Sequence, residues 1–80
     1  MIDFLLTDLD QAALEKGVAR FRGLHPDENW TVTGMKGGQG LTLTITGSRI
    51  QHPAKVIVHR VFDMADSIYT ALEQFREKLT

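Results

Sequence analysis

The most informative part of this sequence is Leu41-Thr42-Leu43-Thr44-Ile45-Thr46. Apolar residues alternate with threonines in it, and side chains along a β-strand point to opposite faces with a period of two. The alternation therefore predicts a strand whose apolar side chains face a core while its threonines form the other face. A sheet with one open face carries helices on one side only, so the stretch predicts an α+β fold.

The composition is that of one small globular domain. The chain has 80 residues, 42% of them hydrophobic, and a formal net charge of −1. This length leaves room for a single core, so we expect one α+β domain over residues 1–80. A net charge so close to zero gives the chain no overall electrostatic attraction to nucleic acid or to a membrane surface. The sequence has no cysteine, no signal-peptide pattern and no apolar run of membrane-spanning length, so we expect a soluble cytoplasmic protein.

Two segments have the apolar periodicity of amphipathic helices. Residues 8–22 follow Thr7, a capping candidate, and Gly23 is expected to end this helix as a C′ residue. A second helix is expected after Asp63, its predicted N-cap. The predicted apolar stripes contain Leu14, Val18 and Phe21 in the first helix and Ile68, Leu72, Phe75 and Leu79 in the second. Residues 1–6 are short and apolar; we favour an extended segment, which would add a fourth strand, over a first helical turn.

Two further alternating segments complete a predicted antiparallel meander of three strands. Residues 30–36 precede the threonine strand, and the glycines at 37, 38 and 40 are expected to supply positive φ angles for the hairpin between them. Residues 54–62 are the predicted third strand, after a connection that starts at Gly47 and closes at His52-Pro53. The predicted order is helix, three strands, helix (αβββα), with both helices on one face of the sheet.

No pattern in the sequence carries catalytic, metal or nucleotide chemistry. Lys36 lies in a glycine-rich run but is followed by glycine between two strands, whereas a phosphate-binding loop needs serine or threonine there and a helix start. The three histidines are not spaced as metal ligands. Four aspartates, at positions 8, 10, 63 and 66, are explained by the dipoles of the two helix N-termini. We therefore expect no enzymatic activity, no metal and no cofactor.

The open face of the sheet is the candidate binding surface. It is almost without acidic residues, is rich in β-branched side chains and contains two apolar residues, Met35 and Ile57. Together with the hairpin tip, the candidate partner-binding residues are Thr31, Thr33, Met35, Lys36, Gln39, Thr42, Thr44, Thr46, Lys55, Ile57 and His59. The alternative is a face that is only solvated, because threonine also has a high strand propensity.

The helix–three strands–helix order is also the layout of the double-stranded RNA-binding domain. Those domains bind phosphate with lysines at the start of the last helix, where this chain has Asp63-Met64-Ala65-Asp66. The open face also lacks the paired aromatic residues of an RNA-recognition motif. A nucleic-acid-binding module is therefore only the third candidate, and we expect no nucleic-acid partner.

In size, single-domain build, lack of cysteine and αβββα order, the chain resembles small phage-encoded inhibitors of the anti-CRISPR type. It differs from the strongly acidic members that mimic DNA. The resemblance implies a non-catalytic protein, in the host cytoplasm, that blocks a CRISPR effector complex by occupying the surface of one subunit. The second candidate is a small oligomeric structural or assembly protein, in which the open face would bind a second copy across a two-fold axis.

Overall fold

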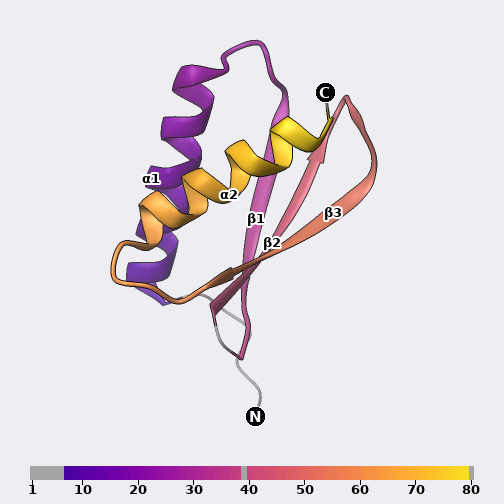
Figure 1. The fold of residues 1–80 in the computed structure, drawn as a ribbon. Helices are drawn as coiled ribbons and strands as arrows, with labels where there is room; N and C mark the ends of the chain where they lie inside the picture. The colour runs from indigo at the N-terminus through magenta and orange to yellow at the C-terminus, as the bar shows by residue number, and fades with distance from the viewer. Residues whose placement is uncertain (1–6, 39, 80) are drawn as a thin grey trace.

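The fold is a small antiparallel sheet with both helices packed on one of its faces (Figure 1). The computed structural model describes residues 7–38 and 40–79. The element order is α1 (Asp8–Leu24), β1 (Trp30–Lys36), β2 (Gly40–Gly47), β3 (Ile50–His59) and α2 (Met64–Leu79). The strands lie in the order β1-β2-β3, each antiparallel to its neighbour, which confirms the αβββα prediction. Residues 1–6, for which we favoured an extended segment, lie outside the described residues.

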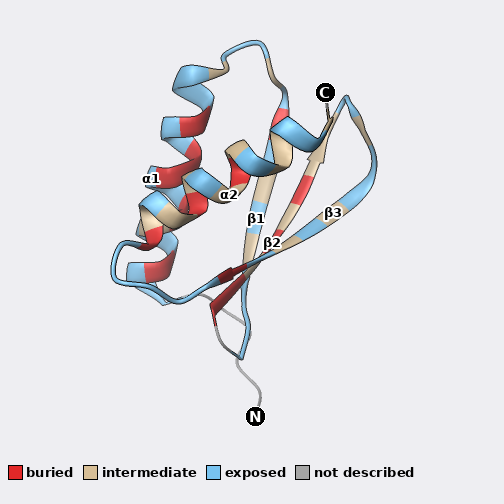
Figure 2. Ribbon diagram, in the orientation of Figure 1, coloured by how far each residue is buried: buried red, intermediate tan, exposed pale blue. Residues whose placement is uncertain are grey.

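The core lies between the helices and the sheet (Figure 2). The central strand β2 supplies Leu41, Leu43 and Ile45, each at most 1% exposed, as the alternation in this stretch predicted. The other buried hydrophobic residues are Leu14, Val18, Phe21, Trp30, Val58, Met64, Ile68 and Leu72. Phe75 and Leu79 pack against this cluster and are partly buried. Both predicted helical stripes therefore face the sheet.

Both helices begin at the predicted caps. The Asp10 N–H donates to the Thr7 hydroxyl over 3.1 Å, and the Asp66 N–H donates to the Asp63 carboxylate over 3.1 Å. Each bond satisfies one of the backbone donors that a helix N-terminus leaves free.

The predicted end of α1 is wrong, because the helix continues through Gly23 to Leu24. His25 is the C-cap, and Gly23 does not have a positive φ. The residue before a proline is disfavoured in the helical region, so Pro26, rather than the glycine, determines where the helix stops.

The first hairpin also differs from its prediction. Among the described residues, no glycine has a positive φ, so the expected role of the glycines at 37, 38 and 40 is wrong. Gly40 is needed for another reason: a Cβ at this position would overlap the carbonyl oxygen of Val58 on the neighbouring strand. The glycine allows the two backbones to approach closely where β2 begins.

The third strand is longer at its start and shorter at its end than predicted. β3 begins at Ile50, directly after a turn at Ser48 and Arg49, and ends at His59. Ile45 pairs with Ala54 and Gly47 pairs with Ile50, so residues 51–53 of β3 bulge opposite a single residue of β2. The expected connection through His52-Pro53 is therefore part of the strand. A bulge accommodates proline because its missing N–H is not needed for the ladder there.

Candidate protein-binding surface

The register of the sheet places most of the predicted surface residues on one face. Residues that pair across adjacent strands point to the same side of a sheet. The pairs are Thr31 with Thr46, Thr33 with Thr44, Thr44 with Lys55, Met35 with Thr42, and Thr42 with Ile57, and His59 follows two residues after Ile57. This face, which we call the open face, lies on the side of the sheet opposite the two helices (Figure 1).

A row of three residues with apolar side chains at its two ends crosses the open face near one end of the sheet. Met35 and Ile57 lie on either side of Thr42, with 53% and 67% of their surface exposed. Lys55 and His59 flank Ile57 on β3, and none of the three strands contributes an acidic side chain to this face in the part of the chain that the structure describes. The open face therefore combines apolar contact area, threonine hydroxyls and a weak local positive charge.

The two predicted hairpin-tip residues do not belong to the open face. Lys36 follows Met35 in β1 and pairs with the buried Leu41, so its side chain starts from the helix side of the sheet. The pKa of Asp10 in α1 is lowered mainly by its hydrogen bonds to Arg60, and the charge of Lys36 lowers it further. Gln39 lies outside the described residues.

Two exposed apolar residues, Val61 and Phe62, extend this surface beyond the sheet into the loop between β3 and α2. Val61 is 48% exposed and Phe62 is completely exposed. They line a hollow of about 570 Å³ between β3 and α2, together with Ile57 on the strand and Asp63 and Asp66 on the side of α2. The sequence prediction placed Phe62 in the last strand and gave it no role. The available signal was two adjacent large apolar residues, which break the alternation of a half-buried strand.

An ion pair between a half-exposed arginine and a buried aspartate holds this loop against α1. Arg60 donates two parallel hydrogen bonds to the carboxylate of Asp10, over 2.9 and 3.0 Å. Asp10 is 2% exposed, and these bonds lower its pKa against the opposing effect of burial. The Val61 N–H donates to the sulfur of Met64 over 3.3 Å on the other side of the loop. Val61 and Phe62 are therefore exposed on a loop that is fixed at both ends.

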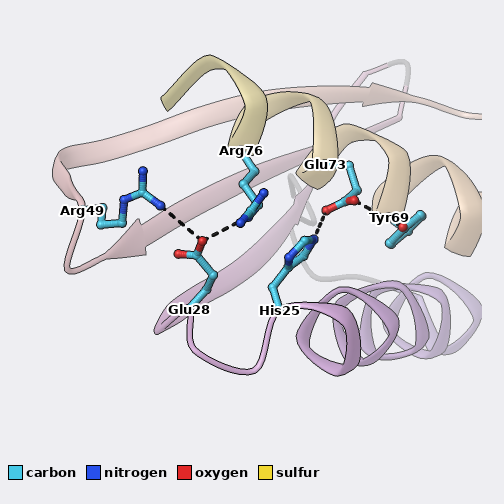
Figure 3. Close-up of polar contacts among 6 residues, drawn as sticks. All are labelled: His25, Glu28, Arg49, Tyr69, Glu73 and Arg76. Atoms are coloured by element: carbon cyan, nitrogen blue, oxygen red, sulfur yellow. Dashed lines mark hydrogen bonds and ion pairs between the residues drawn. The ribbon is translucent and has the colours of Figure 1, made fainter. Parts of the chain in front are cut away.

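The opposite end of the domain is polar (Figure 3). Glu28, in the loop before β1, accepts hydrogen bonds from Arg49 over 3.3 Å and from Arg76 over 3.0 Å. The carboxylate thus joins the β2–β3 turn to the end of α2. Since Glu28 is largely buried, with 11% of its side chain exposed, two cationic partners compensate for its desolvation.

A second polar chain at this end joins α1 to α2 (Figure 3). His25 and Glu73 form a hydrogen bond of 2.5 Å, and the Tyr69 hydroxyl donates to the other carboxylate oxygen over 3.3 Å. Burial, and then the charge of Glu73, raise the pKa of Tyr69. The guanidinium of Arg20 lies 4.0 Å above the Tyr69 ring. These contacts connect α1 to α2, which is a structural role for the side chains that make them.

Within residues 7–38 and 40–79, no group of three or more histidines and acids could hold a metal ion. In the same residues, no helix has the length and apolarity needed to cross a membrane. A comparison with protein-family models found no match for the chain, and neither did comparisons with curated proteins and with solved structures.

Proposed function

We propose that this chain is a non-catalytic protein that binds another protein through the open face of its sheet. The observation that carries the proposal is the row of Met35, Thr42 and Ile57, which has apolar side chains at its two ends and crosses all three strands on the side away from the helices. Covering Met35 and Ile57, both more than half exposed, removes apolar surface from water and so favours association.

The chemistry around the row indicates what kind of partner fits. Threonine hydroxyls donate and accept hydrogen bonds at the polar rim that protein interfaces have around an apolar centre. Lys55 and His59 favour a partner surface that is neutral or acidic. A polyanion is a poorer fit, because Asp63 and Asp66 lie at the start of α2, next to this end of the sheet.

We further propose that the partner is a subunit of a CRISPR effector complex, which the chain inhibits by covering that subunit's surface in the host cytoplasm. The resemblance in size and element order to small phage-encoded inhibitors supports this choice. The net charge of −1 favours contact with a protein surface over imitation of DNA.

A double variant tests the binding face. Met35→Glu combined with Ile57→Glu places two carboxylates at exposed positions, so the variant should fold and melt close to the wild type. In an interface on the open face the same charges would be desolvated, and we expect partner affinity to fall at least about tenfold. The measurement is the capture of purified CRISPR effector complexes, and of proteins from a host lysate, by immobilised wild-type and variant chains.

Leu24→Glu is the matched control. Leu24 is an apolar residue, 57% exposed, at the end of α1 and away from the open face. The Leu24→Glu variant should bind the partner as the wild type does. If the double variant binds as well as the control, the open face is only solvated and the proposed function is wrong.

A further inference from the structure

β3 is an edge strand of the sheet. It pairs with β2 on one side, and among residues 7–38 and 40–79 no strand pairs with its other side. An open edge offers unpaired backbone donors and acceptors to another strand, and proteins usually protect it with bulges, prolines or charges. Here the bulge and Pro53 protect only the first half of β3. Residues 54–59 keep a regular register with β2, so their outer edge can still accept a strand.

The hollow of about 570 Å³ runs along this outer edge. Ile57, Val58 and His59 all line it, although consecutive residues of a strand point to opposite faces of a sheet. A hollow that all three residues line therefore follows the backbone edge of β3 rather than one face of the sheet. The opposite wall of the hollow is one side of α2, with Asp66, Ser67, Thr70, Ala71 and Gln74. A strand added at the usual spacing of about 4.8 Å from β3 would lie in this hollow, beside α2.

The two sides of an added strand would meet different side chains. On the side of the open face its neighbours are Ile57, which is 67% exposed, and the basic residues Lys55 and His59. On the side of the helices are Asp63 and Asp66, and no lysine or arginine of the described residues lines the hollow. Asp63 makes no ion pair with any of the described residues, and Asp66 pairs only with a half-exposed arginine of α1. Apolar side chains therefore fit the first side, and basic side chains fit the second.

We infer that the outer edge of β3 binds an extended segment of a partner protein in which apolar residues alternate with lysine or arginine. The backbone of this segment pairs with residues 54–59, and its apolar side chains lie beside Ile57. Its basic side chains enter the hollow toward Asp63 and Asp66, where the completely exposed Phe62 adds apolar contact. In this mode of recognition the main-chain hydrogen bonds supply affinity and the alternating side chains supply specificity. The segment binds at the edge of the sheet rather than on the open face, so the inference goes beyond the proposed function.

The test is an NMR titration of the isotope-labelled full chain with the acetylated and amidated peptide Thr-Val-Lys-Val-Lys-Val-Thr. We expect a dissociation constant below about 1 mM, with the largest amide shifts at residues 54–59. The matched peptide Thr-Val-Glu-Val-Glu-Val-Thr should bind at least about tenfold more weakly, because its carboxylates would face Asp63 and Asp66.

Two methylated peptides test the backbone pairing. The N–H groups of successive residues in a strand point to opposite edges, so methylating either the valine nitrogens or the lysine nitrogens blocks one edge of the peptide. One of these two peptides should therefore keep its affinity, and the other should lose at least about tenfold. Equal affinity of the two methylated peptides would mean that the peptide does not bind as an added strand.

Variants of the chain separate this site from the open face. Asp63→Asn combined with Asp66→Asn should weaken binding of the lysine peptide at least about threefold, and the amide oxygen of an asparagine can still cap α2. Met35→Glu changes β1, at the far side of the sheet, and should leave peptide binding unchanged. A loss of partner binding in the Met35/Ile57 double variant therefore remains a separate result, since Met35 tests the open face alone.

Several outcomes would overturn the inference. These are no binding of the lysine peptide, equal binding of the glutamate peptide, or amide shifts centred on β1. A chain that sediments as a dimer and binds no peptide would mean that a second copy covers the edge. A peptide that binds only after residues 1–6 are deleted would mean that the chain covers its own edge.

Discussion

Two glycines of α1 allow a sharp test of how the helices pack. Gly17 faces α2, where a Cβ would lie 2.8 Å from the carbonyl oxygen of Ala65 and 3.0 Å from a methyl carbon of Ile68. Gly23 lies in the same helix with nothing within 4 Å of an added Cβ. We expect Gly17→Ala to destabilise the protein and Gly23→Ala to stabilise it.

The magnitude follows from two effects that differ between the sites. Alanine is favoured over glycine within a helix by up to about 1 kcal/mol, and both variants gain some of this. Only at Gly17 must the new methyl group push against a backbone oxygen, and overpacking of this kind costs about 1–3 kcal/mol. The free energies of unfolding of the two variants should therefore differ by about 1–3 kcal/mol, with Gly23→Ala the more stable.

Thermal melting of both variants beside the wild type measures this difference. For a domain of this size, each kcal/mol shifts the melting temperature by about 4–8 °C, so the variants should melt at least about 4 °C apart. Equal melting temperatures would refute the close approach of the helices at Gly17. A Gly23→Ala variant that melts below the wild type would instead support the left-handed C′ role that the sequence suggested for Gly23.

Two other changes probe the core and the ion pair between Asp10 and Arg60. Leu43→Ala should lower the free energy of unfolding, measured in urea, by about 3–5 kcal/mol. Leu43 is 0% exposed and pairs with Gly34, which has no side chain to fill the space. A loss under about 1 kcal/mol would mean that the two sheet faces are reversed. Arg60 lowers the pKa of Asp10 in the folded state, so the stability from this pair is present above about pH 5 and is lost as the pH falls through the lowered pKa. Asp10→Asn should therefore reduce the fall in melting temperature between about pH 5 and pH 2, and an unchanged fall would contradict this role.

Local sequence patterns were enough to predict the architecture and most of the candidate surface. The period-two pattern at residues 41–46 separates core from open face without any knowledge of the neighbouring strands, because alternation is a property of one extended chain. The caps at Thr7 and Asp63 were predictable for the same reason, since each hydrogen bond spans only three residues. The threonines, Met35 and Ile57 could be assigned to one face because hairpin-connected strands continue that alternation.

The features that join distant parts of the chain could not be predicted in this way, because they depend on tertiary packing. Asp10 and Arg60 are separated by 50 residues, and the local sequence explains Asp10 fully as a first-turn acid. Nothing within α1 requires a glycine at position 17; the requirement arises from the close contact with α2. The exposure of Phe62 depends on how the β3–α2 loop is held between α1 and the sheet edge. These properties arise from the packing of elements against one another, and hydrophobic periodicity describes one element at a time.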